Sequence, residues 1–233
     1  MAMTAPLLSV IIPALNEAEN LPRLLEDLHI LRAVGAELIL VDGGSHDGSA
    51  QQSVTAVDQI LTTAPGRARQ MNAGASLASG RYLWFLHADT RVPARACQRL
   101  LEVLGEQPAW GRFDVQLSGA GPSLRLIGNM ISLRSRLTGI ASGDQGIFVA
   151  RSVFAELGGY AELPLMEDLE LSRRLKRLAR PRCLWPPLVT SSRRWEQHGI
   201  WRTVLLMWRL RLAYYCGASP EKLARQYYGG PPS

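Results

Sequence analysis

RYLWFLHADTRV, residues 81–92, is the stretch of sequence that decides the fold. Its first half is a run of aromatic and branched apolar residues, which is typical of a strand buried on both faces. The run ends at His87-Ala88-Asp89, so that a carboxylate follows directly after a buried strand. A carboxylate in this place either caps the helix expected after Pro93 or belongs to a site.

Three further apolar runs have the same character, and polar or glycine-containing sequence follows each of them. Helical patterns separate the runs. Alternating β and α segments predict an α/β fold with a mostly parallel sheet, helices on both faces, and ligands at the carboxyl ends of the strands. The predicted strands are residues 7–13, 36–41, 57–63 and 81–87, all taken as buried on both faces, and the helical patterns are 17–32, 45–54 and 66–78.

Polar clusters follow three of these strands at the point where each strand ends. Asn16-Glu17 follow the first strand, Asp42 follows the second, and Asp89 closes the fourth. Because the carboxyl ends of parallel strands meet at one edge, we expect these side chains to lie together. Taken alone, Asp42 is also what an Asp-Gly turn requires, so its role stays open.

The second half of the chain is less regular but continues the same domain. We predict one domain over residues 1–196, with a first half of about 1–109 and a second half of 110–196, followed by an amphipathic helical tail over 197–233. Residues 110–117 alternate like a strand, and 143–151 read as a loop entering a short strand. Residues 123–137 carry a broad apolar face opposite Arg125, Ser132 and Arg136, and 166–178 form a helix with a stripe of Leu171, Leu175 and Leu178.

Composition narrows the class of protein. The 233 residues are 47% hydrophobic and carry a net charge of +6, but only two of the 26 basic residues are lysines. No basic run interleaves with aromatics and no nucleic-acid motif is found, so we expect no nucleic-acid partner. Three widely spaced cysteines indicate reduced, buried thiols in a cytoplasmic protein. The N-terminal apolar run has no basic residue before Arg23, and we interpret it as a strand rather than a signal peptide.

Two common phosphate-binding loops are missing. The first strand is not followed by G-x-G-x-x-G, and no G-x-x-x-x-G-K-[ST] occurs. A nucleoside diphosphate would therefore need a divalent metal on a carboxylate, helped by arginine, and Asp89 and Arg67 can supply both. Glu167-Asp168 open a helix, where acids are favourable in any case and where one could also act as a general base.

The order of these acids resembles that of the inverting family-two nucleotide-sugar glycosyltransferases, which have the GT-A fold. GRARQMNAGA, LHADT and GDQGIF are further similar to a bacterial subgroup found beside radical-SAM, selenodomain and arsenosugar-type genes. The segments that carry the resemblance are SVIIPALNEAENL (9–21), LILVDGGSHDGS (38–49), GRARQMNAGASLASGRYLWFLHADTRV (66–92), GDQGIFVARSVFAELGGYAE (143–162), MEDLELSRRL (166–175) and SSRRW (191–195).

The resemblance implies transfer of a sugar, with inversion, from a UDP- or GDP-type donor to an unidentified acceptor. It further implies that residues 1–196 form a GT-A catalytic domain, with a nucleotide-binding half of about 1–109 and an acceptor half of 110–196. A role follows for each matching residue. Pro13, Glu17 and Asp42 would line the nucleoside pocket, Arg67 and Asn72 would lie near the base or diphosphate, Asp89 would bind Mg²⁺ or Mn²⁺, Asp144 and Gln145 would face the sugar or acceptor, and Asp168, beside Glu167, would be the catalytic base.

One position departs from the family pattern, because relatives often carry an acid where this chain has His87. A neutral imidazole adds no negative charge, so we expect the metal to need the donor phosphates, with His87 or His198 as a further ligand, and to bind weakly without nucleotide. A degenerate nucleotide-sugar-binding or scaffold protein of the same fold is the alternative. A sugar-phosphate nucleotidyltransferase is a poorer match, since its glycine-rich loop is absent.

The tail contains a helical segment at residues 199–217 with apolar residues on two sides. One side can dock on the domain, and the other needs a homodimer partner or a membrane surface to cover it. A lipid-linked acceptor would explain peripheral contact with the inner face of a membrane. One stripe is Trp201, Val204, Leu205, Trp208, Leu212 and Tyr215, and the other is Leu206, Met207, Leu210 and Tyr214.

Overall fold

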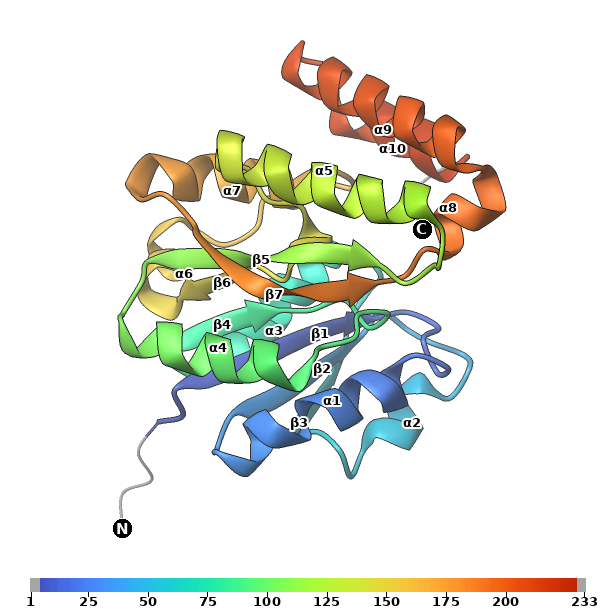
Figure 1. Cartoon of the computed structure of the whole chain (residues 1–233). Helices are drawn as coiled ribbons and strands as arrows, with labels where there is room; N and C mark the ends of the chain where they lie inside the picture. Colours follow the sequence, from blue (N-terminus) through green and yellow to red (C-terminus); the bar gives the residue numbers. More distant parts are fainter. Residues whose placement is uncertain (1–4, 230–233) are drawn as a thin grey trace.

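A seven-stranded sheet lies between two layers of helices in the computed structural model, which describes residues 5–229 except for the side chains of Arg194 and His198 (Figure 1). The strand order is β3-β2-β1-β4-β6-β5-β7. The strands are β1 (Leu8–Ala14), β2 (Glu37–Asp42), β3 (Gln59–Thr62), β4 (Tyr82–Phe85), β5 (Trp110–Leu117), β6 (Phe148–Ala150) and β7 (Arg182–Thr190).

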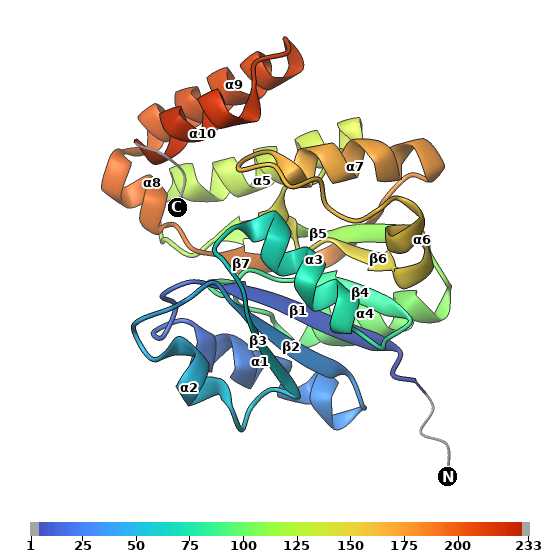
Figure 2. The same cartoon turned by 180° about the vertical axis from the view of Figure 1, so that it is seen from behind.

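The helices follow the strands in near alternation and cover both faces of the sheet. Helices α1 and α4 pack on one face, and α3, α6 and α7 pack on the other, as the two views from opposite sides show (Figure 2). The helices are α1 (Leu21–Ala33), α2 (Ser49–Ser53), α3 (Arg67–Leu77), α4 (Ala94–Gly105), α5 (Pro122–Thr138), a 3₁₀ turn η1 (Gly143–Gln145), α6 (Arg151–Glu156), α7 (Glu167–Leu178), α8 (Arg193–His198), α9 (Ile200–Tyr215) and α10 (Pro220–Tyr228).

The parallel core of the sheet is formed by β3, β2, β1 and β4. Strand β1 is buried along its whole length, because neighbours pair with both its edges and helices cover both its faces. In this register Ala14 lies opposite Asp42, and Phe85 lies opposite Ile11. The strands therefore end close together, as the βαβ pattern predicts. Only β6 breaks the parallel arrangement, since it pairs antiparallel with both β4 and β5.

Strand β3 corrects one prediction. Its residues alternate between partly buried and exposed, with Ile60 36% exposed, rather than being buried on both faces. The reason is its place at the edge of the sheet, where β2 is its one pairing neighbour among the described strands. The apolar run alone could not show that the strand lies at the edge.

Helix α5 corrects another prediction. Its buried face includes Ser132, whereas the sequence predicts that the apolar face opposite Ser132 is buried. Ser132 and Ser135 are buried, whereas the side opposite them is exposed. Buried Arg112 of β5 donates to the backbone oxygen of Ser132 at 3.1 Å, and the backbone N–H of Val115 donates to Ser132 Oγ at 3.0 Å. These hydrogen bonds satisfy buried polar groups that an apolar face would leave unpaired. The exposed residues are Leu126, Met130, Leu133 and Leu137.

Two smaller expectations are also wrong. Leu178 is 50% exposed, although Leu171 and Leu175 of the same predicted stripe are fully buried, because Leu178 is the last residue of α7. Cys97 is buried, but Cys183 is only partly buried and Cys216 is exposed. All three cysteines are free thiols in the structure.

The C-terminal segment forms a pair of helices, α9 and α10, that lies above α5 and α7 in both views (Figures 1 and 2). Leu210 of α9 and Leu223 of α10 are buried together with Leu169 of α7. The opposite side of α9 is exposed. Among residues 5–229, no helix combines the length and apolarity needed to cross a membrane. The exposed apolar residues of α9 are Trp201, Leu205, Trp208, Leu212 and Tyr215.

Candidate active site

Two adjoining cavities open at the carboxyl edge of the parallel strands. The first cavity has a volume of about 600 Å³, and the second has a volume of about 250 Å³. A volume of several hundred cubic ångströms suits a small-molecule ligand. The same four side chains line both cavities and so mark where they join: Glu17, Arg67, His87 and Asp89.

The loops after β1 and β2 hold each other in place beside the first cavity. The backbone N–H of Asn16 donates to Ser45 Oγ at 2.8 Å, and the backbone N–H of His46 donates to Asn16 Oδ1 at 3.0 Å. Asn16 has φ of 54°, a left-handed conformation that asparagine tolerates better than most residues. The turn that it makes carries Glu17 to the cavity wall.

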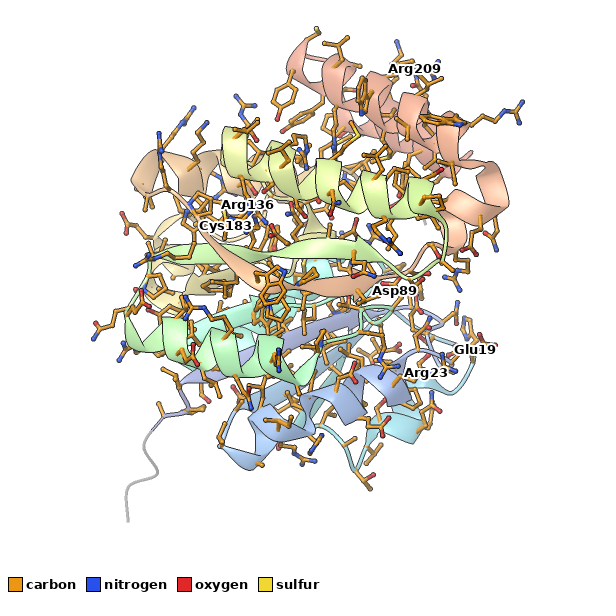
Figure 3. The ribbon with its side chains drawn as sticks, viewed as in Figure 1. Glu19, Arg23, Asp89, Arg136, Cys183 and Arg209 are labelled. Carbon is orange, nitrogen blue, oxygen red and sulfur yellow. The ribbon has the colours of Figure 1, made fainter. Side chains whose placement is uncertain are left out.

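Glu17 and Asp89 place two carboxylates at the junction of the cavities. Burial raises the pKa of Glu17, and the negative charge of Asp89 adds to the rise, while a hydrogen bond from Asn20 at 2.6 Å opposes it. Asp89 does not cap α4, since that helix starts after Pro93 without a side-chain cap. Asp89 lies at the end of the sheet (Figure 3) and lines both cavities.

His87 pairs with an acid from the second half of the chain. Its Nδ1 lies 3.3 Å from Asp144 Oδ1. Burial lowers the pKa of His87, but the hydrogen bond with Asp144 and the negative charges of Asp144 and Asp89 together outweigh it, and the net shift is upward. Burial raises the pKa of Asp144, but the hydrogen bond and charge of His87, together with nearby arginines, make the net shift downward. Because 49% of the Asp144 side chain is exposed, water in the cavity screens the pair.

Asp168 is held by two backbone donors at the start of α7. The N–H of Gly143 donates to Oδ2 and the N–H of Leu169 donates to Oδ1, each at 2.7 Å. A Cβ on Gly143 would lie 2.8 Å from the imidazole of His87, so only glycine allows this approach. Met166, just before α7, has φ of 70°, a strained conformation for a residue other than glycine.

Glu167 lies next to Asp168 but in a different environment. Its side chain is 6% exposed, and burial together with the charge of Asp168 raises its pKa to about 7. Adjacent acids whose surroundings differ in this way can take different protonation states at neutral pH. The fold therefore gives these two neighbours different roles: Glu167 is partly neutral, whereas the carboxylate of Asp168 is oriented by two backbone N–H groups.

Three of the predicted site residues do not line either cavity. Asp42 is 4% exposed and accepts hydrogen bonds from the backbone N–H groups of the loop that follows it, the arrangement of an Asp-Gly turn. Asn72 makes two hydrogen bonds with the backbone of Tyr160, at 2.8 and 2.9 Å. Gln145 is fully buried, with its amide bonded to the backbone of Ser142 and Phe113. All three shape the loops around the cavities.

The remaining predicted residues do line the cavities, and the C-terminal segment adds others that sequence patterns missed. Pro13 lines the first cavity, and Asp144, Glu167 and Asp168 line the second. Long-range packing brings Tyr228 of α10 to the first cavity and Arg193 and Arg211 to the second. The local sequence contains one signal for Arg211, which is that a charged residue stands within an otherwise apolar helix.

A divalent cation fits the junction of the cavities only in part. Mg²⁺ and Mn²⁺ prefer oxygen ligands, which Asp89 and Glu17 can offer. Within residues 5–229, no group of three His, Cys, Asp or Glu side chains is placed to hold an ion. The side chain of His198, the more distant ligand expected from the sequence, lies outside the described part of the chain. The residues present could thus hold a cation together with phosphate oxygens of a ligand.

The mostly parallel sheet, with acids at its carboxyl edge, is the arrangement found in the GT-A class of glycosyltransferase folds. Residues 9–151 match Glycosyl transferase family 2, and the chain belongs to this family. The predicted fold class and family are therefore confirmed.

Related proteins have diverse names. The chain is 30% identical over 166 residues to a "PGL/p-HBAD biosynthesis glycosyltransferase" of Mycobacterium bovis, with 68% of this chain and 64% of the relative covered. It is 32% identical over 166 residues to an "undecaprenyl-phosphate 4-deoxy-4-formamido-L-arabinose transferase" of Serratia proteamaculans, with 59% and 46% covered. The chain thus spans less than two thirds of the length of these relatives.

Solved structures share the fold at low sequence identity. TarS 1–349 of S. aureus in complex with UDP-GlcNAc superposes with a TM-score of 0.65 and 17% identity, covering 79% of this chain and 58% of that one. The mannosyltransferase PcManGT of Pyrobaculum calidifontis in complex with GDP-Man and Mn²⁺ gives 0.59 and 20%, with 81% and 57% covered. At these identities, the likeness supports the fold.

Glu167→Gln tests the electrostatics of the site through stability. Glu167 has a pKa of about 7 in the folded state and about 4.5 in the unfolded state. Between these two pH values the native state therefore binds one proton more than the unfolded chain does. Raising the pH through this window therefore lowers the free energy of unfolding, by about 3 kcal/mol. Glutamine cannot ionise, so the variant should lose roughly 10 °C of the fall in Tm between pH 4.5 and pH 8.

Thermal unfolding followed by circular dichroism across this pH range measures the effect. Glu102→Gln, at an exposed position on α4, is the matched control and should keep the wild-type slope. A Glu167→Gln variant with the same pH dependence as the wild type would show that Glu167 does not titrate in this window.

Proposed function

We propose that this chain transfers a sugar from a UDP- or GDP-type nucleotide sugar to an acceptor, with inversion at the anomeric carbon. The observation that carries the proposal is the pair of cavities that join at Asp89 and Arg67. One cavity can hold the nucleotide, while the other contains Asp168, so the anomeric carbon would lie at the junction. Three sequence motifs, GRARQMNAGA, LHADT and GDQGIF, are similar to motifs of the radical-SAM and arsenosugar-associated subgroup. This similarity further supports membership of that subgroup.

The first cavity suits the donor. It is the larger of the two, and Pro13, Glu17 and Arg67 line it. The complexes of TarS with UDP-GlcNAc and of PcManGT with GDP-Man and Mn²⁺ support a nucleotide-sugar donor and a divalent cation. When bound, Mg²⁺ or Mn²⁺ at Asp89 would neutralise charge on the diphosphate. Arg67 would add positive charge from the start of α3.

The second cavity suits the acceptor and the base. Asp168 would take the proton of the acceptor nucleophile as that atom forms its bond to the anomeric carbon. The bond from that carbon to the diphosphate oxygen breaks on the opposite face, and its electron pair leaves with the nucleoside diphosphate. Gly143 and Leu169 orient Asp168 through their N–H groups, which leaves the carboxylate in one position relative to the acceptor.

We further propose that residues 1–196 form the catalytic domain, with halves of about 1–109 and 110–196, and that 197–233 is a tail that completes the site. Arg211 and Tyr228 of that tail stand in the cavity walls, which supports a role beyond packing. On this view the tail belongs to acceptor recognition, and the protein is cytoplasmic with the tail at a membrane.

The outer surface of α5 and α9 supports contact with a membrane. Each helix exposes an apolar stripe, and α9 adds two tryptophans and a tyrosine, which favour bilayer interfaces. Arg202 and Arg209 are exposed on the flank of the α9 stripe, with Arg209 pointing away from the domain in Figure 3, and would attract anionic headgroups. A lipid-linked acceptor, as in the name of the Serratia relative, fits this surface.

Asp168→Asn should abolish transfer while leaving metal-dependent nucleotide binding intact, because asparagine keeps the shape of the side chain but cannot accept the proton. Product formation with a panel of nucleotide sugars, beside a thermal-shift titration of UDP and GDP with Mn²⁺, gives both readouts. Turnover that persists, or nucleotide binding lost together with turnover, would refute the role of Asp168. A wild type that binds nucleotide sugar without turnover would favour the degenerate binding protein.

Asp89→Ala should remove the metal dependence of nucleotide binding, since it deletes the carboxylate at the junction of the cavities. Calorimetric titration of UDP or GDP with and without Mn²⁺ measures this. The wild-type protein should bind Mn²⁺ weakly until nucleotide is present. Identical metal dependence in the variant would rule out Asp89 as the ligand, and Asp47→Ala, at an exposed acid of the neighbouring loop, is the control.

The double variant Trp201→Ser, Trp208→Ser should lower the fraction of protein that floats with anionic vesicles, by about tenfold or more, because each tryptophan contributes apolar area at the interface. Val34→Ser, Val54→Ser removes exposed apolar side chains elsewhere and should float like the wild type. Absence of wild-type flotation together with a dimer that the tryptophan variant disrupts would assign the surface to a second copy instead.

A further inference from the structure

Two arginines near the second cavity have buried nitrogens without hydrogen-bond partners. These atoms are Nε and Nη2 of Arg134, on α5, and Nε of Arg211, on α9. Arg211 lines the second cavity together with Asp168, and Arg134 lies behind it, within reach of the charges of both residues. Buried guanidinium nitrogens without partners are costly, so each of them needs an explanation.

The two guanidinium groups also repel each other. Burial lowers the pKa of Arg134 to about 10, and the positive charge of Arg211 is the next largest cause. The negative charge of Asp168 opposes this shift without reversing it. Two like charges therefore lie close together in a poorly hydrated place, where they weaken the folded state unless an anion joins them.

Two other arginines with little exposure have partners that Arg134 and Arg211 lack. Arg112 is fully buried, and although its Nε also has no partner, its other nitrogens form an ion pair with Asp114 and bond to backbone oxygens of Phe113 and Ser132. Arg174 pairs with Glu170 on the same helix and donates to two backbone oxygens. Among the described residues, Arg134 and Arg211 thus differ from these two arginines in having no carboxylate partner.

The acids nearest to the gap already have partners. Both oxygens of Asp168 accept backbone N–H groups, and Asp144 pairs with His87. Neither forms an ion pair with Arg134 or Arg211 within the described part of the chain. Since the acids nearest to the gap within residues 5–229 are already engaged, a ligand is the source of an anion that would satisfy both arginines.

We propose that Arg134 and Arg211 form a subsite for a phosphate monoester carried by the acceptor. A phosphate monoester holds close to two negative charges and three acceptor oxygens, which matches two guanidinium groups better than a single carboxylate does. The inference rests on the proposed glycosyltransferase function, because it assigns the second cavity to the acceptor. It defines the acceptor as a phosphorylated molecule bound beside Asp168.

The position of the subsite separates it from the donor. Arg67 stands at the junction with the first cavity, whereas Arg211 comes from α9, which lines the second cavity, and Arg134 comes from the neighbouring helix α5. These helices expose apolar stripes on their outer sides. A phosphate on a lipid could reach the gap from that surface, and a soluble phosphate monoester could enter through the cavity. Both sources present the same chemistry to the arginines.

Direct binding tests the subsite on the full chain. Glycerol phosphate and decyl phosphate, a short-chain lipid phosphate, are titrated by calorimetry into the wild type, Arg211→Met, Arg134→Met and Arg211→Lys. The methionine variants keep the length of the stem and lose the charge, so affinity should fall about ten- to hundredfold. Arg211→Lys should lie between, since lysine keeps the charge without the planar donors. Arg95→Met, at an exposed position of α4 on the other face of the sheet, should bind like the wild type.

Stability supplies the second readout. Without phosphate, Arg134→Met and Arg211→Met should melt at or above the wild-type temperature, because each removes one of two unpaired like charges. Tighter binding of decyl phosphate than of glycerol phosphate, by tenfold or more, supports the subsite with a lipid source. Equal affinities support it with a soluble source.

Phosphate affinity that does not depend on Arg211, or a Tm that falls in both methionine variants, would overturn the proposal and make these arginines structural. Binding of UDP or GDP with Mn²⁺ is measured on the same samples and should survive in Arg211→Met. A wild type that binds phosphate at Arg211 but no nucleotide would count against the glycosyltransferase function while leaving the anion subsite in place.

Discussion

The parallel register of β2, β1 and β4 is the constraint on which the rest of the structure depends. Hydrogen bonding between these strands places Ala14 opposite Asp42 and Phe85 opposite Ile11, so β1 and β2 end level and β4 ends slightly earlier at the same edge. The polar residues that follow them have no room in the apolar layers and emerge at one edge. Glu17 and Asp89 meet there, although many residues separate them in the sequence. The later segments are built onto that edge.

The second half of the chain supplies the other side of the site through backbone geometry. The 3₁₀ turn η1 brings Gly143 against His87, at a distance that leaves no space for a Cβ. The same glycine donates its N–H to Asp168. A single close approach therefore fixes both the imidazole and the acid at the start of α7. The strained Met166 just before α7 is consistent with a helix whose start is set by the site.

The burial of arginine side chains on the inward sides of α5 and α9 explains why these helices expose so much apolar surface. Arg112 and its partners use the inward side of α5, and Arg134 and Arg211 occupy the gap between the helices. Apolar side chains of both helices are thereby left on the outside. An arrangement that places charge inside and leucine and tryptophan outside is unfavourable for stability alone, and it is understandable where the charge binds a ligand and the outer surface meets a partner.

The sequence by itself determined the α/β class, the family and most element positions, because strand and helix periodicity and short motifs are local signals. It also identified Glu17, Arg67, Asp89, Asp144, Glu167 and Asp168, all of which line the cavities. The edge position of β3, the inward face of α5 and the internal hydrogen bonds of Asn72 and Gln145 were decided only by the tertiary structure. So was the arrival of Arg211 and Tyr228 at the site. These features depend on which distant segment packs against each residue, and a residue's own neighbours in the chain carry no record of that contact.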